Sequence, residues 1–284
     1  MSAQILDGLG LSKIIRETLK HRVDSIRAKG IIPRLDVLVA AQDPASLSYV
    51  RMKQMWAEKA GMEGHSYPVT DETSQQELLD KIAELNADPK VHGILLQHPL
   101  PKHLDEQEAL IALGAEKDVD GISPASLGRL VADLPGFRCA TPLGIMNLLQ
   151  HYEIPIQGKR VVVVGRSVIL GKPAALMLLQ KHATVTIAHS RTLDLPDLCR
   201  QADILVAAVG KAEMVKGDWI KPGAVVIDAG YNKVEGRKWD VGDVEFESAS
   251  QVASWITPVP GGVGPMTVAS LLCNAVDSAE SHLA

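Results

Sequence analysis

One stretch in the middle of the chain constrains the fold more than any other. Val161–Val164 are consecutive β-branched residues, a run that favours a buried strand. Gly165 and Gly171 follow, and good helix formers begin at Ala174. In this order a strand, a glycine loop and a helix N-terminus aim backbone N–H groups and the positive end of the helix dipole at an anion. We therefore predict a nucleotide-binding site here, with an ordinary strand-to-helix turn as the alternative.

The glycine loop does not by itself select a nucleotide, because the full G-x-G-x-x-G fingerprint is absent. The end of the next predicted strand is more informative. An NAD site usually has Asp or Glu there to bind the ribose 2′-hydroxyl, whereas this chain has Ser190 and Arg191. Together with Arg166 in the loop, these residues offer donors and positive charge to a 2′-phosphate. The sequence therefore favours NADP over NAD, and a basic surface loop is the alternative.

Helix-like and strand-like periodicities alternate along most of the chain, which predicts an α/β fold with mostly parallel sheets and helices on both faces. A length of 284 residues suits two domains, the second of nucleotide-binding type. The glycine- and proline-rich segment 118–142 is the predicted hinge. Helices are predicted at 9–27, 46–60, 75–85, 143–151 and 266–281, and strands at 35–40, 91–97, 161–164, 184–188, 204–209 and 224–228.

Composition excludes several classes of protein. A net charge of −5 disfavours nucleic-acid binding, which needs a surplus of Lys and Arg. No apolar run is long enough for a bilayer, and no signal peptide is recognisable. The three cysteines favour a reducing compartment, so we expect a cytoplasmic protein with no membrane partner.

A metal site and a thiol nucleophile are also disfavoured. His92, His98 and His103 lack a thiolate or carboxylate at ligand spacing, so no metal is predicted. Cys139 lacks a histidine signature of a catalytic cysteine.

Tyr49 and Lys53 stand four residues apart and share one face of a predicted helix. A lysine in a partly apolar pocket can have a depressed pKa and carry protons, and a tyrosine can stack on a planar ring. An amphipathic surface helix is the commoner fate of such a pair. Short-chain dehydrogenases have the same Tyr-x-x-x-Lys spacing, but their cofactor loop comes before the pair and here it comes after.

Other polar positions fit a binding site. Gln97 ends a predicted strand, and ligands of open α/β sheets gather beyond the carboxyl ends of strands. Asp118 and Asp120 stand just before a turn at Gly121, where turn capping is the alternative role. The glycine-rich segment 257–267 could bring its backbone close to a flat ligand.

Taken in order, these motifs resemble the bifunctional methylenetetrahydrofolate dehydrogenase/methenyltetrahydrofolate cyclohydrolase (FolD) family almost end to end. The motifs that carry the resemblance are Ile5–Gly8, Asp43–Ser46 with Tyr49 and Lys53, His92–Gln97 with Pro99–Pro101, Lys117–Gly121, Val164–Ser167, His189–Ser190, Ile227–Asn232 and Pro258–Thr267. The resemblance implies oxidation of 5,10-methylenetetrahydrofolate to the 5,10-methenyl form with NADP⁺, followed by hydrolysis to 10-formyltetrahydrofolate.

The resemblance also implies an architecture. An N-terminal folate-binding domain of residues 1–138, joined by the C-terminal helix 266–284, would face a Rossmann-like NADP-binding domain of residues 139–265 across a cleft. A homodimer would form through the second domain.

Residue roles follow from the same resemblance. Lys53 would be the catalytic lysine and Gln97 the partner that tunes its protonation. Tyr49 would stack against the folate, and Asp120 would hold the pterin ring. The folate site would also include the backbone of Pro260, Gly261, Gly262 and Val263. NADP would contact Gly165, Arg166, Ser167, Ser190, Arg191 and Tyr231. The chain departs from the family at Ala140, His98 and Tyr231, none of which removes a reactive group.

Two rival functions are carried forward. A short-chain-type or other NADP oxidoreductase acting on a different substrate would use Tyr49 as the acid and have no role for Gln97. A non-catalytic NADP- or folate-binding protein would bind without turnover, which the set of Lys53, Gln97 and Asp120 disfavours.

Overall fold

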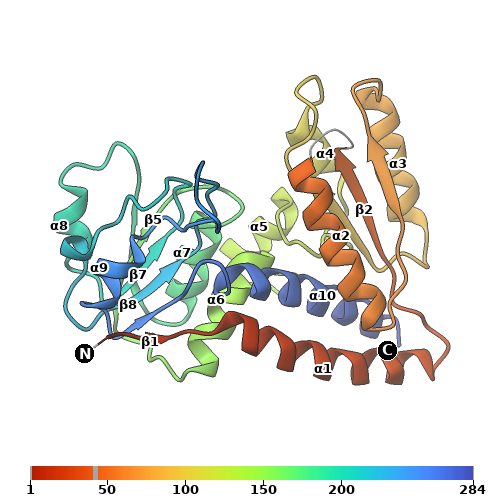
Figure 1. The fold of residues 1–284 in the computed structure, drawn as a ribbon. Helices are drawn as coiled ribbons and strands as arrows, with labels where there is room; N and C mark the ends of the chain where they lie inside the picture. Colours follow the sequence, from red (N-terminus) through yellow and green to blue (C-terminus); the bar gives the residue numbers. More distant parts are fainter. Residues whose placement is uncertain (1, 41–43, 284) are drawn as a thin grey trace. The chain divides into compact units, whose positions relative to one another are not determined.

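The structure, a computed structural model, describes residues 2–40 and 44–283, and the side chains of residues 44–46, 48 and 49 lie outside the description. The chain forms two compact units, and each contains a parallel sheet (Figure 1). Unit 1 is Met1–Lys13 with Thr141–Ala269, and unit 2 is Ile14–Ala140 with Ser270–Ala284. The predicted α/β class with two domains is confirmed. No helix in the described part of the chain is long and apolar enough to cross a membrane.

Unit 1 has, among the described residues, a six-stranded parallel sheet in the order β1-β9-β8-β7-β5-β6. Its strands are β1 (Gln4–Ile5), β5 (Arg160–Val164), β6 (Thr184–Ala188), β7 (Ile204–Ala207), β8 (Val225–Asp228) and β9 (Trp255–Ile256). The helices nearby are α6 (Ala140–His151), α7 (Gly171–Gln180), α8 (Leu195–Cys199), η1 (Gly217–Trp219) and α9 (Phe246–Ser250). The central strands β7 and β8 are buried throughout, as parallel strands covered on both faces must be. After β5 the chain adds β6 on one side of β5 and then returns to add β7 on its other side. The boundary between β5 and β7 is therefore a topological switch point.

The start of the chain departs from the prediction, which placed it in the N-terminal domain. Its backbone instead belongs to unit 1, because Gln4 pairs with Trp255 at the sheet edge. Gly8 packs so closely on the glycine-rich segment that a Cβ there would lie 1.8 Å from the carbonyl oxygen of Gly262. Leu9 N–H donates to the carbonyl of Gly261 at 2.8 Å. A two-residue strand carries too short an apolar pattern to be recognised from sequence.

Unit 2 has a parallel sheet of order β3-β2-β4 in the part of the chain that the structure describes. Its strands are β2 (Leu35–Ala40), β3 (Ser66–Val69) and β4 (Gly93–Gln97), and its helices include α2 (Pro44–Lys59), α3 (Gln75–Ala87), α4 (Glu106–Ala112) and α5 (Pro124–Val131). Leu38 pairs with Leu96, and both face the core that α3 and α4 cover. Since strand side chains alternate, the neighbouring pair Val39 and Gln97 faces the opposite side, toward α2, which packs on β2.

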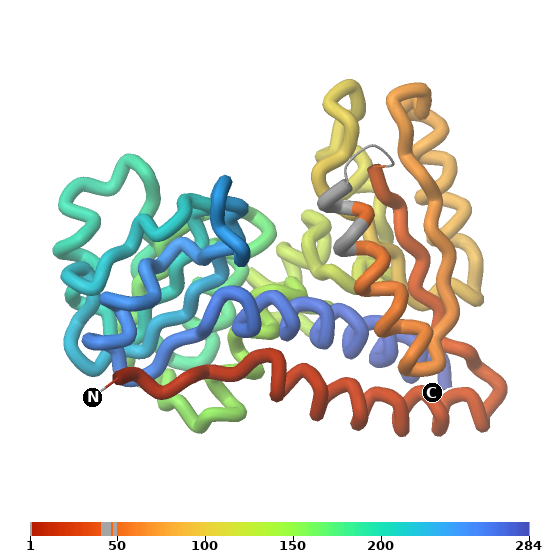
Figure 2. Tube along the Cα trace, viewed as in Figure 1, coloured from red at the N-terminus to blue at the C-terminus, as the bar shows by residue number. Residues whose placement is uncertain are grey.

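Two long helices, α1 (Gly8–Arg27) and α10 (Val263–Ser281), contribute residues to both units. Within unit 2 the end of α10 lies beside α1, as the blue and red tubes of Figure 2 show. The Arg22 guanidinium bonds Glu280 at 2.6 Å. The buried Asn274 amide donates to the carbonyls of Val119, at 2.8 Å, and Arg138, at 3.0 Å. The last helix therefore completes the core of unit 2.

The predicted loop at 118–142 is wrong in its middle, because Pro124–Val131 form helix α5. Ser123 caps this helix by accepting the N–H of Ser126 at 3.2 Å, and Pro124 occupies the first turn, where its missing N–H costs nothing. Proline and glycine are common in loops, which is why Pro124 and Gly128 favour a loop when only the sequence is considered. Ser-Pro at a helix start was the signal that would have found the helix.

His92 generates a prediction about stability and pH. It is buried before β4, its Nδ1 accepts the N–H of Arg34 at 3.2 Å, and its ring meets His282 edge-on at 5.1 Å. Burial is the largest cause that lowers the pKa of His92, from 6.5 to about 4, and the charge of nearby His282 is the second. Between these values the unfolded chain binds more protons than the folded one, so stability falls as the pH falls.

We expect the free energy of unfolding to drop by roughly 2 kcal/mol more in wild type than in His92→Gln between pH 7 and pH 5, measured by urea titration. The exposed His21→Gln variant serves as the control and should follow wild type. Identical pH profiles for all three proteins would contradict the assignment.

Candidate functional site

Helix α2 and strand β4 bring a lysine and an amide together in unit 2. Lys53 is 7% exposed, and its Nζ donates to Gln97 Oε1 at 2.9 Å. The Gln97 amide nitrogen donates to the carbonyl of His98 at 3.0 Å, which turns the amide oxygen toward the lysine. The strand register produces this contact, because it directs Gln97 to the α2 side of the sheet. The structure therefore brings Lys53 and Gln97 into contact, and their catalytic roles stay predictions.

The two acids of the Asp118–Gly121 turn have different surroundings. Asp118 is buried and accepts the backbone N–H of Ser123 at 2.8 Å, so it serves as a turn cap. Asp120 instead lies within electrostatic reach of Lys53. Burial lowers the pKa of Lys53 while Asp120 opposes the shift, and burial raises the pKa of Asp120 while Lys53 opposes that shift. A lysine with a lowered pKa can be neutral near pH 7 and accept a proton. We call Lys53, Gln97 and Asp120 the lysine cluster.

Tyr49 lies one turn before Lys53 in α2, but its side chain is outside the described residues.

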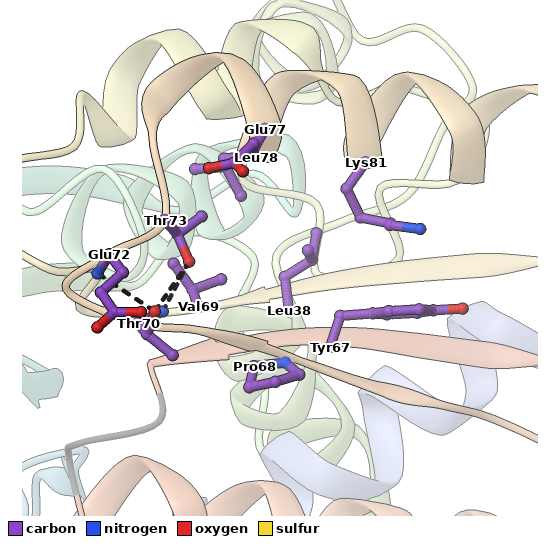
Figure 3. Close-up of a pocket in the computed structure, with 10 residues that line it drawn as sticks. All are labelled: Leu38, Tyr67, Pro68, Val69, Thr70, Glu72, Thr73, Glu77, Leu78 and Lys81. Carbon is purple, nitrogen blue, oxygen red and sulfur yellow. Dashed lines mark hydrogen bonds between the residues drawn. The ribbon is translucent and has the colours of Figure 1, made fainter.

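A pocket of about 410 Å³ in unit 2 lies apart from the lysine cluster (Figure 3). Two of its charged groups have partners: Glu77 accepts the N–H of Ser74 at 2.7 Å, and the Lys81 ammonium stands over the Tyr67 ring at 5.0 Å. No member of the lysine cluster lines it. Its lining is Leu38, Tyr67, Pro68, Val69, Thr70, Glu72, Thr73, Glu77, Leu78 and Lys81.

The glycine loop of unit 1 is a tight backbone cradle. Gly165 has φ +139°, and a Cβ there would lie 2.2 Å from the carbonyl oxygen of Ala208. A Cβ on Gly171 would lie 2.3 Å from the carbonyl oxygen of Gly165. Ser167 Oγ accepts the N–H groups of Leu170 and Gly171 at 3.2 and 3.3 Å. Both glycines are therefore sterically required, which is how backbone comes close enough to bind a phosphate.

Exposed polar side chains surround this cradle at the carboxyl edge of the sheet. Arg166 and Ser167 follow β5, and Ser190 and Arg191 follow the neighbouring β6. Tyr231 follows β8, is 49% exposed and bonds Asp240. The loop has room for a ligand only because its glycines lack side chains, and exposed guanidinium groups lie beside it. This combination suits the phosphates of a dinucleotide.

The remaining candidates have structural roles or lie in unit 1. Cys139 is buried, its Sγ donates to the carbonyl of Gly121 at 2.8 Å, and burial raises the pKa of its thiol. His98 pairs with Glu106, whereas the ring of His103 bonds the carbonyl of Thr73. No group of three or more metal-ligating side chains occurs among the described residues.

The glycine-rich segment Pro260, Gly261, Gly262 and Val263 belongs to unit 1. A Cβ on Gly262 would lie 2.6 Å from the carbonyl oxygen of Pro258, so this backbone is tightly folded on itself.

Sequence reasoning missed two buried carboxylates, Asp228 and Asp243. Each accepts several backbone N–H groups near the ends of β7 and β8. The glycines at positions 230 and 242 were the available signal, because a Cβ at either would strike one of these carboxylates.

A switch-point cradle in one α/β unit and a buried lysine cluster in the other define the class of protein: an enzyme that uses a dinucleotide cofactor. Residues 6–120 match the catalytic domain of the tetrahydrofolate dehydrogenase/cyclohydrolase family, and residues 139–283 match its NAD(P)-binding domain. The chain belongs to this family, so the predicted family is confirmed.

Curated relatives match over nearly the whole chain. The bifunctional protein FolD of Moorella thermoacetica is 56% identical over 98% of this chain and 99% of its own length. The FolD structure from Campylobacter jejuni has a TM-score of 0.97 at 44% identity and covers 99% of this chain and 100% of its own. The Trypanosoma brucei FolD, solved with NADP and an inhibitor, has a TM-score of 0.94 at 37% identity and covers 100% of this chain and 99% of its own.

The cradle generates a prediction. We expect Gly165→Ala to weaken NADP⁺ binding at least tenfold, because the new Cβ would displace the backbone after β7. The matched control is Gly158→Ala, which also has positive φ, +74°, but no atom within 4 Å of its Cβ. Calorimetric titration with NADP⁺ measures both, and equal affinities would refute the steric role of Gly165.

Proposed function

We propose that this protein oxidises 5,10-methylenetetrahydrofolate to 5,10-methenyltetrahydrofolate with NADP⁺ and then hydrolyses the product to 10-formyltetrahydrofolate. The observation that carries the proposal is the buried Lys53 bonded to Gln97, with Asp120 in electrostatic reach, in a chain of this family. The phosphate cradle at Gly165 supplies the second requirement, a place for the cofactor.

Unit 1 would hold the cofactor. The backbone from Gly165 to Gly171, with the Ser167 hydroxyl, would bind the pyrophosphate at the start of α7. Arg166, Ser190 and Arg191 would bind the 2′-phosphate, which their charge and donors suit. Tyr231 would contact the same cofactor from the end of β8. When bound, NADP⁺ supplies the acceptor for the hydride that leaves the bridging methylene of the folate.

The folate would be bound by residues that provide one flat surface and one polar anchor. Asp120 would bond the polar edge of the pterin with its carboxyl oxygens. Tyr49 would stack on the ring system. The backbone of Pro260, Gly261, Gly262 and Val263 would approach the ligand where side chains are small or absent.

Lys53 would serve the hydrolytic step as a base. Its burial favours the neutral amine, whose lone pair can take a proton from the water that adds to the methenyl carbon. Gln97 accepts one N–H of the lysine amine and so fixes the direction of the other N–H group and of the lone pair. After addition, cleavage of the carbon bond to N5 leaves the formyl group on N10, and the net reaction consumes one water and releases one proton.

The two rivals make different demands on these residues. An oxidoreductase of the short-chain type would use Tyr49 as its acid and leave Gln97 idle, yet Gln97 is bonded to the buried lysine. Burial of a lysine side chain costs free energy. A binding protein without turnover would gain nothing from that cost. Tyr49→Phe separates the first rival: near-total loss of hydride transfer supports it, and a modest effect supports stacking.

We expect Lys53→Met to abolish cyclohydrolase activity, with a loss of at least 100-fold, while NADP⁺ affinity stays within twofold of wild type. Lys53→Arg should be equally inactive, because arginine keeps its proton. The exposed Lys59→Met, on the same helix, is the control and should hydrolyse methenyltetrahydrofolate normally. Hydration is followed as loss of methenyl absorbance, and an unchanged rate in Lys53→Met would remove the lysine from the mechanism.

The proposal extends to a cytoplasmic homodimer formed through unit 1. Three free cysteines suit a reducing compartment. Strand β6 ends the sheet, and Ile187 on it is 42% exposed. An edge strand with an exposed apolar residue readily pairs with another chain.

We expect Ile187→Asp to shift the sedimentation coefficient from dimer to monomer. Ile111→Asp, at a 64% exposed position on α4, is the matched control and should remain dimeric. A monomeric wild type would end this part of the proposal.

A further inference from the structure

Asp243 is fully buried in unit 1, and its two carboxylate oxygens accept four N–H groups of the described chain. Oδ2 accepts from the backbone of Val209 at 2.6 Å and Gly210 at 3.0 Å. Oδ1 accepts from the backbone of Lys211 at 2.9 Å and from the side-chain amide of Asn232 at 2.9 Å. One side chain therefore joins two segments that are far apart in the sequence.

Both segments lie at the carboxyl ends of strands beside the switch point. Residues 208–211 follow β7, and the carbonyl of Ala208 is the atom that excludes a Cβ from Gly165. Residues 229–232 follow β8 and include Tyr231. Parallel sheets bind their ligands at this edge, so the two segments border the cofactor site we propose.

The surroundings of Asp243 hold it in place. Asp228 accepts the backbone N–H of Asp243 at 2.9 Å and that of Val244 at 2.9 Å. A Cβ on Gly230 would lie 2.4 Å from Asp243 Oδ1, so only glycine lets the β8 segment approach the carboxylate. Such a carboxylate is bound in a shell of fixed donors and has one orientation.

We propose that Asp243 is a positioning residue for NADP⁺, which fixes the segments 208–211 and 229–232 in the conformation that binds the cofactor. This inference rests on the proposed function. A bare carboxylate close to a phosphate site would repel the ligand, but the four donors around Asp243 offset its charge. Without the carboxylate, three consecutive N–H groups after β7 lose their acceptor, and the segment must rearrange to satisfy them.

The test replaces one carboxylate oxygen with an amide nitrogen. In Asp243→Asn the side-chain NH2 group would face N–H donors that the carboxylate oxygen had accepted. The segment 208–211 is therefore displaced. We expect the Kd and the KM for NADP⁺ to rise at least tenfold and kcat to stay within about threefold. Hydrolysis of methenyltetrahydrofolate needs no redox cofactor, and its rate should stay within twofold of wild type.

Asp203→Asn is the matched control. Asp203 also accepts a backbone N–H, that of Arg160 at 2.9 Å, but next to the opposite, amino end of β5. We expect this variant to bind NADP⁺ like wild type.

Asn232→Ala is the milder second variant, because it removes only one of the four bonds. It decides the matter if Asp243→Asn does not fold, and its Kd for NADP⁺ should rise about threefold with cyclohydrolase activity intact. Wild-type affinity in a folded Asp243→Asn, or in Asn232→Ala when the first variant is unfolded, overturns the inference. A proportional loss of cofactor binding and hydrolysis in the deciding variant overturns it as well, since that result marks a general structural role.

Calorimetric NADP⁺ binding separates this inference from the proposed function. If wild type binds NADP⁺ but does not oxidise methylenetetrahydrofolate, the proposed reaction fails, while the binding constants still decide the role of Asp243.

Discussion

The lysine at position 53 can be buried only because β4 delivers an amide oxygen to it. A buried amine is costly unless its polar head has a partner. Burial favours the neutral form of Lys53, and the Gln97 oxygen accepts one of its N–H groups. The lysine cluster depends on three features of unit 2. They are the register of the three-stranded sheet, the packing of α2 on β2 and the turn that ends at Gly121. A shift of β4 by one residue would turn Gln97 to the face that α3 covers, and the lysine would lose its partner.

The sequence predicted the elements that carry a strong period or an unbroken apolar run. Strands β5 and β7 are buried along nearly their whole length, and α1 and α10 are long enough for their spacing to be clear. It failed where elements are short. Strand β3 has four residues with Pro68 among them, and β1 has two, so neither shows a period. Helix α5 was hidden because its capping residues were interpreted as loop residues.

Sequence patterns indicated the parts of the candidate site whose residue types are informative by themselves. The glycines of the cradle stood out by their pattern. Lys53 by itself favoured an amphipathic surface helix, and Gln97 was only a polar residue at a strand end, so the roles of both came from the family resemblance. Asp228 and Asp243 did not stand out, since a carboxylate that serves as an acceptor for backbone N–H groups looks in sequence like any other acidic residue. Their importance arises from strands and loops that meet only in the folded chain. The family resemblance supplied roles for Tyr49 and Asp120 that spacing alone could not.

The interleaved course of the chain has a consequence for how it is made. Unit 2 needs Asn274 to satisfy the carbonyls of Val119 and Arg138, yet Asn274 follows them in the chain by 155 and 136 residues. Unit 1 needs β1, which is synthesised long before its partner β9. Unit 1 therefore cannot complete its sheet before β9 is synthesised, and unit 2 cannot satisfy these carbonyls before α10 is synthesised. Truncation before Ser270 would remove part of unit 2, which is otherwise built by Ile14–Ala140.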